Sequence, residues 1–325
     1  MIRSTFRATA GALLLALAAG HSHAQLADAE KYPNKPIRFV VAFAAGSATD
    51  TVARFVGAHI TKVTGQPVVI ENKPGGNGFL AASFVAKAPR DGYTALVTTQ
   101  TTHAANPALF KRLPYDPVKD FTPIATVSKG ATVLLARKDF PANNVRELTE
   151  LAKKSPGSLT FASSSASARA GGELYKLLAG VDLLHVPYQS PSQIMTDIAG
   201  GRVDLTWSDG LNAMTNIRSG KMKALATTGA ERMSSTPDIP TFAEQGLTDY
   251  QLYAWTAVYL PAQAPEAVAR RLNELVREAI VSDPSYFRQS GSEPNPLTLE
   301  QFARFQEKEI ALWARIVKAA GMEQE

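Results

Sequence analysis

The amino-acid sequence predicts an α/β fold with two lobes, mostly parallel sheets and a cleft between the lobes. Short apolar segments alternate with amphipathic helical segments along most of the chain, which is the pattern of a parallel sheet covered by helices. Two apolar, strand-like segments connect the two predicted lobes, and no Gly/Ser linker separates independent modules. The 325 residues, 45% hydrophobic and 19% charged, suit two globular domains, and the absence of cysteine excludes a disulfide scaffold.

The first series of elements begins with an apolar run at residues 37–43, which indicates a strand buried on both faces. Val52, Val56, Ile60 and Val63 follow at helical spacing, and Gly65 ends that helix. This repeated strand–helix order predicts parallel pairing near the start of the chain. The next expected elements are a strand at 67–71, a turn at 72–78, a helix through 88 and a strand at 93–99.

A second series continues the alternation, and two long helices end the chain. The last helix carries an apolar stripe that includes Phe302, Ile310 and Trp313, so we expect it to pack on the sheet. The expected elements are strands at 132–138 and 159–162, helices at 145–154 and near 172–179, shorter elements at 182–186, 193–199, 203–207 and 223–227, and helices at 265–282 and 297–320.

The two strand-like connections, near residues 123–130 and 250–261, predict a hinged protein whose second lobe is inserted into the first. We expect the first lobe to comprise residues 25–127 and 250–325, and the second lobe residues 128–249. In open α/β sheets a ligand binds outside the carboxyl ends of the strands. The loops at those ends are therefore the candidate site.

Residues 1–24 have the features of a cleaved secretory signal peptide. Arg3 and Arg7 give a basic start, residues 10–19 form an apolar core too short to span a bilayer, and residues 22–24 form a small-x-small end. Cleavage after Ala24 lowers the formal net charge from +5 to +3, because two arginines are lost. A charge this small, without long basic runs, argues against nucleic-acid binding. It fits either the binding of small anions or solubility alone.

Most catalytic and cofactor patterns are missing from the sequence. Without residues 1–24 the chain holds three histidines, His59, His103 and His185, and none belongs to a zinc-binding motif. A G-x-S-x-G element and a phosphate-binding P-loop are both absent. We therefore expect no metal, no cofactor and no enzyme. The alternative is an exported hydrolase that uses the serines at 163–165, but these lack a nearby base and are better interpreted as hydroxyl donors.

Two loops have the layout of an anion-binding helix start. In residues 43–50 (FAAGSATD), Ser47 is placed as the N-cap and Asp50 follows three positions later, as in a capping box. The small residues before the helix leave backbone amides open, and amides at a helix start bind anions. Residues 163–169 (SSSASAR) repeat this layout. Two such helix starts facing one cleft predict a clamp for a carboxylate.

Motifs along the whole chain after residue 24 carry a resemblance to one family. The chain resembles the Bug family, the periplasmic solute receptors of tripartite tricarboxylate transporters. The matching text is Tyr32-Pro33-x-Lys35-Pro36-Ile37-Arg38, Gly65-Gln66-Pro67-Val68-Val69-x-Glu71-Asn72-Lys73-Pro74-Gly75, Val85-Ala86-Lys87-Ala88-x-x-Asp91-Gly92-Tyr93-Thr94, Asn106-Pro107, Leu113-Pro114-Tyr115-Asp116-Pro117, His185-Val186-Pro187-Tyr188, Pro240-Thr241-x-x-Glu244-x-Gly246 and Trp255.

The resemblance implies a two-lobed, type II-like periplasmic binding fold that closes on its ligand. It also implies a small organic acid as ligand, a two-part inner-membrane permease as partner and a periplasmic location, and we expect a monomer that binds no nucleic acid. The family's first loop usually has proline and glycines where this chain has Ala45, Ser47 and Ala48, and Ser165 and Ser167 replace glycines of the second loop. An aromatic acid and an aliphatic dicarboxylate both remain open as ligands.

The candidate ligand-binding residues come from the two loops and from the ends of neighbouring strands. Arg169 is a cation at a helix start, which the helix dipole disfavours, so we interpret it either as a solvated side chain or as a fork for the ligand carboxylate. Asp50 either caps its helix or holds the first loop in its binding shape. The full set is Phe43, Ala44, Ser47, Ala48, Thr49, Asp50, Thr102, Ser163, Ser165, Ser167, Arg169, Tyr188, Gln189 and Asp209.

Overall fold

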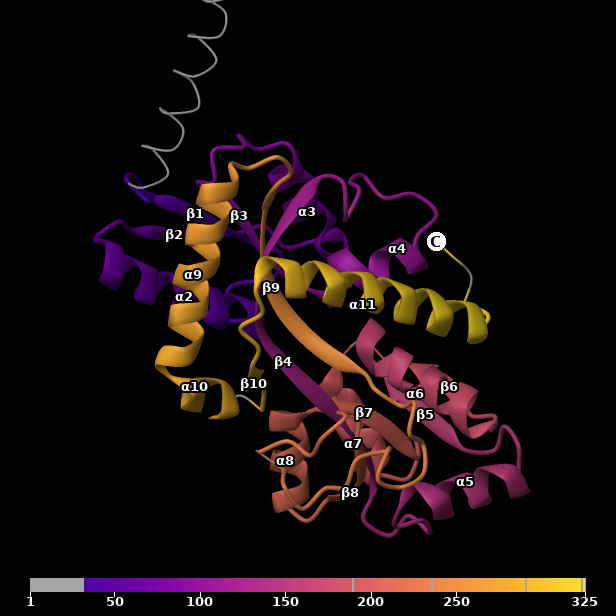
Figure 1. Ribbon diagram of the computed structural model, residues 1–325. Helices are drawn as coiled ribbons and strands as arrows, with labels where there is room; N and C mark the ends of the chain where they lie inside the picture. The colour runs from indigo at the N-terminus through magenta and orange to yellow at the C-terminus, as the bar shows by residue number, and fades with distance from the viewer. Residues whose placement is uncertain (1–31, 189, 235, 290, 323, 325) are drawn as a thin grey trace, which may run out of the picture.

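The computed structural model describes residues 32–325, except 189, 235, 290, 323 and 325 (Figure 1). The signal peptide predicted at residues 1–24 and the candidate Gln189 lie outside the described residues. The described strands form one ten-stranded sheet in the order β2-β1-β3-β9-β4-β7-β5-β6, with β8 and β10 also paired to β4. No helix in this described part of the chain is both long and apolar enough to cross a bilayer.

The first group of elements follows the predicted strand–helix order. Strand β1 pairs in parallel with β2 on one side and β3 on the other, as expected for strands joined by crossover helices. Helix α2 ends at Gly65, whose φ of 73° is the left-handed conformation that glycine adopts readily. The elements are β1 (Ile37–Val41), α2 (Ala48–Thr64), β2 (Val68–Asn72), η1 (Gly76–Gly78), α3 (Phe79–Ala86), β3 (Thr94–Thr99), the π-helical turn η2 (Thr101–Ala105) and α4 (Asn106–Leu109).

Two long antiparallel strands form the centre of the sheet. Strand β4 (Phe121–Arg137) pairs with β9 (Tyr253–Pro261) over most of the length of β9. Figure 1 shows both strands running between the part of the molecule that holds β1 to β3 and the part that holds β5 to β8. The sequence indicated only a connection and a separate strand at 132–138 here. Parallel pairing is therefore confined to the two outer groups, and an antiparallel centre joins them.

The second group also alternates strands and helices. Strand β5 pairs in parallel with β6 and β7, whereas β7 and β8 pair antiparallel with β4. The elements are α5 (Val145–Lys154), β5 (Thr160–Ser163), α6 (Ala166–Ala179), β6 (Leu184–Pro187), α7 (Pro191–Ala199), β7 (Leu205–Asp209), α8 (Gly210–Arg218) and β8 (Met222–Thr227).

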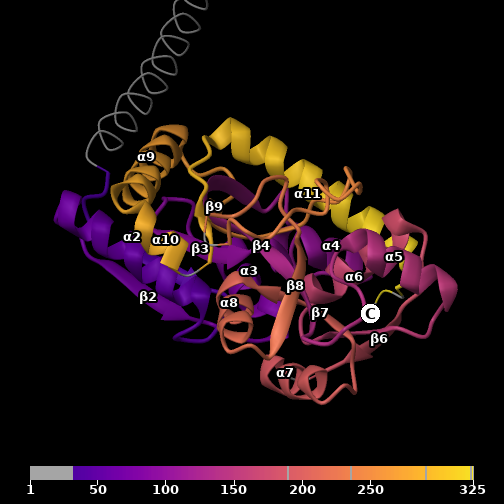
Figure 2. The ribbon, with the colours of Figure 1, turned by 90° about the horizontal axis from the view of Figure 1, so that it is seen from below.

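The C-terminal elements cover both groups. They are α9 (Glu266–Ser282), α10 (Pro284–Gln289), β10 (Glu293–Pro294) and α11 (Leu299–Ala319). Figure 2 shows α11 along one side of the molecule, where it reaches from β9 toward α4 and α6. Its Phe302 and Trp313 are buried in the largest apolar core, which also contains Leu96 of β3 and Trp207 of β7. The predicted apolar stripe of the last helix is thus confirmed.

The predicted lobe boundaries fall within β4 and just before β9. Both connections between the lobes are therefore strands or the approach to a strand, rather than flexible linkers. We use "first lobe" for residues 25–127 and 250–325 and "second lobe" for residues 128–249. Their movement relative to one another stays a prediction.

Candidate functional site

A cleft with a volume of 690 Å³ lies between the starts of α2 and α8, one from each predicted lobe. Its lining is mostly small or polar, with Val52, Trp255 and Tyr286 as the larger apolar or aromatic side chains. Among the described residues that line it there is one acid, Asp209, and no Lys, Arg or His. Any anion bound here is therefore met by amides and hydroxyls rather than by a cationic side chain. The lining comprises Gly46, Ala48, Thr49, Thr51, Val52, Thr99, Gln100, Ser128, Gly130, Ala131, Thr132, Asp209, Gly210, Asn212, Ala254, Trp255, Thr256, Tyr286, Gln289, Gly291 and Ser292.

The start of α2 presents backbone amides to this cleft. Ser47 is the N-cap, with extended backbone, and its hydroxyl accepts the Asp50 N–H at 3.2 Å. The first residues of a helix have no carbonyl partner within the helix for their amides. Within the described part of the chain, nothing accepts a hydrogen bond from the amides of Ala48 or Thr49, and both residues line the cleft. Two donors at the positive end of a helix dipole thus face the cleft.

Asp50 holds the loop before α2 in shape. Its side chain is buried, and Oδ2 accepts the Gly46 N–H and the Arg54 Nε–H, each at 2.9 Å. Oδ1 accepts Asn72 Nδ2–H at 2.9 Å, and the same amide nitrogen donates to the Phe43 carbonyl at 3.0 Å. The Arg54 hydrogen bond, with those from Gly46 and Asn72, lowers the pKa of Asp50 to about 2.

This geometry differs from the expected capping box. The Asp50 carboxylate accepts from Gly46, the residue before the N-cap, and not from Ser47 itself. The reason is the left-handed φ of 81° at Gly46, which turns that amide toward the helix. Of the other candidates in this loop, Ala44 is exposed and the Phe43 side chain packs on the largest apolar core.

The start of α8 lies at the same cleft from the second lobe. Asp209 is its N-cap: Oδ1 accepts the Asn212 N–H at 2.9 Å and Oδ2 accepts Asn212 Nδ2–H at 2.6 Å. We expected the starts of α2 and α6 to face each other. The structure instead lines the cleft with the starts of α2 and α8, because β7, which precedes α8, lies beside the central strand β4.

The serine-rich loop before α6 reaches the cleft only indirectly. Ser165 caps α6 by accepting the Ala168 N–H at 3.2 Å, and the buried Ser163 has its Oγ 2.7 Å from His185 Nε2. Ser167 Oγ accepts a hydrogen bond of 2.6 Å from Nε2 of Gln100, which lines the cleft. Each serine hydroxyl already has a partner: Ser165 caps α6, Ser163 contacts His185, and Ser167 accepts from Gln100.

Gln100 is a residue that the sequence analysis missed. It follows β3 directly and is 4% exposed. Strand β3 pairs with β9 as far as Thr99 opposite Thr256, and the Gln100 side chain then accepts the next N–H, that of Trp255, at 3.0 Å. The Nε2–H of the Gln100 side chain donates to the hydroxyl of Ser167 in the second lobe. No local pattern marks this role, because it depends on strands far apart in the sequence.

Three further candidates lie outside the cleft lining. Thr102 is fully buried, with its Oγ1 2.8 Å from Thr98 Oγ1. Arg169 lies 4.0 Å from Glu173 Oε1, and its Nε is buried without a hydrogen-bond partner among the described residues. Burial, and then the Arg169 and Lys176 charges, lower the pKa of His185 to about 4.

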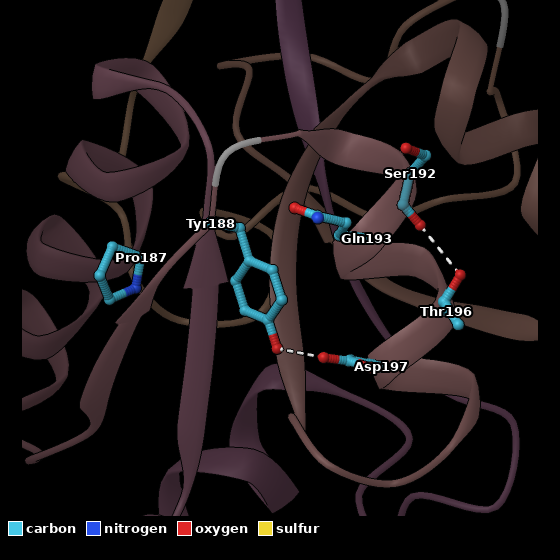
Figure 3. A pocket seen from close by; sticks show the side chains of 6 residues that line it. All are labelled: Pro187, Tyr188, Ser192, Gln193, Thr196 and Asp197. Carbon is cyan, nitrogen blue, oxygen red and sulfur yellow. Dashed lines mark hydrogen bonds between the residues drawn. The ribbon is translucent and has the colours of Figure 1, made fainter.

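Tyr188 is the third candidate outside the cleft lining. It lines a separate pocket of 530 Å³ between β6 and α7 (Figure 3). Its hydroxyl donates to Asp197 Oδ2 at 2.8 Å, and Pro187, Ser192, Gln193 and Thr196 complete the lining. Gln189 beside it lies outside the described residues.

Comparisons with known proteins agree with this architecture. Residues 52–322 match the model of the tripartite tricarboxylate transporter family receptor. A UPF0065 protein of Bordetella pertussis is 33% identical over 316 residues, which cover 96% of this chain and 95% of that protein. The structure of R. palustris Rpa4515 with adipate is 32% identical, covers 90% of this chain and 100% of that one, and has a TM-score of 0.77.

A second solved structure, MatC from Rhodopseudomonas palustris with bound malate, is 34% identical, covers 88% of this chain and 100% of that one, and has a TM-score of 0.71. The expected two-lobed, type II-like periplasmic binding fold is confirmed by these structural neighbours. The chain belongs to the receptor family of the tripartite tricarboxylate transporters, the family to which the Bug proteins belong.

Proposed function

We propose that this protein is a periplasmic receptor that captures a small carboxylic acid in the cleft between α2 and α8 and delivers it to a two-part inner-membrane permease. The observation that carries the proposal is the pair of unpaired amides, Ala48 and Thr49, at the start of a long helix and in the wall of a cleft between the predicted lobes. Such a helix start favours negative charge. Relatives that bind adipate and malate support the same class of ligand.

The cleft lining favours recognition through neutral donors. Hydroxyls of Ser128 and Thr132 and the amide of Gln100 surround the space next to α2. Hydrogen bonds to a charged group are stronger than those between neutral groups, so a carboxylate held by several of them does not require a cationic side chain. Asp209 on the opposite wall adds a negative charge. The acid is therefore expected to place one carboxylate at α2.

The aromatic side chains of the cleft offer a ligand at most one ring face, that of the half-buried Tyr286. Trp255 is 2% exposed, and one face of Tyr286 stacks on Phe55 with ring centroids 4.1 Å apart. We therefore favour an aliphatic mono- or dicarboxylate over an aromatic acid.

A binding screen tests the ligand class. Adipate, malate and benzoate are titrated into the purified protein, with the corresponding neutral amides as controls, and binding is followed by thermal shift and calorimetry. A ligand that binds only the folded state raises the melting temperature. We expect saturable binding of an aliphatic acid, weaker binding of its diamide, and the acid recovered unchanged by NMR.

Two outcomes contradict the proposal. If none of the acids binds saturably, the cleft is not a carboxylate site. If a product appears, the protein is an exported hydrolase, the alternative for which the Ser163–His185 pair is the available machinery. Ser163 is 6% exposed, which disfavours attack on a substrate.

Closure of the lobes is a second part of the proposal. Receptors with a central cleft close by a hinge, and here both crossings involve strands β4 and β9. Solution scattering at saturating ligand should show a smaller radius of gyration than the ligand-free protein. An unchanged radius would rule out a large hinge motion.

Delivery and location require tests in cells. We expect the mature protein in the periplasmic fraction, beginning after Ala24, and we expect uptake of the bound acid to require both this protein and a two-part permease. Uptake that persists without the receptor would remove the delivery role but leave the binding role intact.

A further inference from the structure

The cleft has a third wall, formed by the segment between α9 and α11. Tyr286, Gln289, Gly291 and Ser292 line the cleft together with the starts of α2 and α8. We call residues 286–289 and 291–293 the strap. Figures 1 and 2 both show α10, which contains the first part of the strap, between α2 and α8. The strap thus lies where the two lobes meet.

The strap is anchored firmly in the first lobe. Phe287 is fully buried and meets the ring of Phe55 edge-on, with centroids 5.4 Å apart. Tyr286 stacks on the same ring, and its hydroxyl donates to the Thr51 carbonyl of α2 at 3.0 Å. These contacts bury apolar surface, so they hold the strap to α2 irrespective of the position of the second lobe.

Its contacts with the second lobe are polar or made by the backbone, and Glu293 pairs antiparallel with Lys129 of β4, close to the lobe boundary. The Glu293 carboxylate accepts the Ser234 N–H at 3.1 Å and also the Ser234 hydroxyl. At the start of α8, a β-carbon added to Gly210 would lie 3.1 Å from the Gly291 carbonyl oxygen. Gly130 of β4 has the same relation to that oxygen, at 3.3 Å. The strap reaches the second lobe because these positions carry no side chain.

We propose that the strap closes over the bound acid, and that its contact with the start of α8 determines how slowly the ligand leaves. This inference rests on the proposed receptor function. The ligand space lies between α2, α8 and the strap. Because Tyr286 attaches the strap to Thr51 of α2, we expect the strap to follow α2 when the lobes open. Opening of the lobes therefore breaks the Gly291–Gly210 and Glu293–Ser234 contacts together. Contacts formed only in the closed state slow dissociation more than they speed association.

The substitution Gly210→Ala tests the strap. Gly210 is the first residue of α8, and alanine favours a helix more than glycine does, so the fold is expected to stay stable. The added methyl group would lie 3.1 Å from the Gly291 carbonyl oxygen, so the strap must shift away from α8 by a few tenths of an ångström. Gly200→Ala is the matched control, because its β-carbon would meet only carbonyl oxygens of the preceding turn, at 3.5 Å and 3.8 Å. Ser234→Ala removes a second strap contact at an exposed position.

Dissociation of adipate, and in parallel of malate, is followed by stopped-flow intrinsic fluorescence in the full-length mature protein. We expect Gly210→Ala to speed dissociation by about 10-fold, Ser234→Ala by about 3-fold and Gly200→Ala not at all. The association rate of Ser234→Ala, which lies outside the cleft lining, and the ligand-free melting temperatures of all three variants should be unchanged. Wild-type dissociation rates in both Gly210→Ala and Ser234→Ala would overturn the strap proposal and leave the receptor function standing. If the wild-type protein binds no carboxylate in the screen, the receptor function fails and the strap proposal fails with it.

Discussion

Replacing Gln100 by glutamate places one negative charge at the cleft with almost no change in shape. In the wild-type protein, the Gln100 side chain accepts the Trp255 N–H at 3.0 Å and donates to the Ser167 hydroxyl at 2.6 Å. A carboxylate keeps the acceptor for Trp255, and the Ser167 hydroxyl can reverse its role and donate. The hydrogen bonds of the fold are therefore kept, although ionising a carboxyl at this buried position lowers the free energy of unfolding at high pH. A bound anion meets a new like charge.

The size of the effect follows from Coulomb's law. Two negative charges about 6–8 Å apart, at an effective dielectric constant of about 20, repel by roughly 2–3 kcal/mol. Gln100→Glu should therefore weaken carboxylate binding by about 30- to 150-fold. Because position 100 is 4% exposed, burial raises the pKa of the introduced carboxyl, and the loss should be larger at pH 8 than at pH 5.

Calorimetric titration with the best acid at both pH values measures this loss. Gln301→Glu is the control, since it adds the same charge at the exposed start of α11, where glutamate also completes a capping box. Equal dissociation constants for Gln100→Glu and wild type at pH 8, in a protein that is still folded, would show that the acid does not bind beside Gln100.

Three further predictions concern ionisable groups. Asp50→Asn weakens the hydrogen bond to Arg54 and loosens the loop before α2, so we expect urea melts to show a fall of about 2 kcal/mol in the free energy of unfolding. The affinity for the carboxylate should fall more than it does in a core variant that is destabilised to the same extent. Asp209→Asn keeps the helix cap but removes the negative charge of the cleft, so calorimetry should show several-fold tighter dicarboxylate binding; weaker binding would contradict this. Burial raises the pKa of Glu309, which accepts Trp255 Nε1–H at 2.8 Å, from 4.5 to about 7. The folded protein therefore binds the Glu309 proton more tightly than the unfolded chain does, and the free energy of unfolding should fall by ~3 kcal/mol as the pH rises from about 4.5 to about 7. Glu309→Gln should remove this fall. Parallel pH profiles for the two proteins would refute the assignment.

Much of the local structure follows from the sequence because short-range chemistry decides it. The apolar run before residue 43 forms β1, and Gly65 ends α2 in the left-handed conformation. Ser47 caps the helix that it was expected to cap. Each of these features depends on residues within one or two turns of each other.

The sequence also placed the chain in its receptor family, since the matching motifs are local stretches of text. It identified the start of α2 as a candidate anion site by the same kind of reasoning, and that start does line the cleft. The ligand-binding role of its residues stays a prediction.

Only the tertiary structure decided which loops meet. β7 lies next to β4, so the start of α8, and not that of α6, lines the cleft opposite α2. Gln100 links Trp255 and Ser167, which lie 155 and 67 residues away in the chain. The strap approaches β4 and α8 closely because Gly130 and Gly210 leave room for the Gly291 carbonyl. These contacts depend on the order of strands in the sheet and on the packing of distant segments. Helix caps and apolar periodicity are properties of neighbouring residues, so they can be predicted without knowledge of the strand order or of the packing.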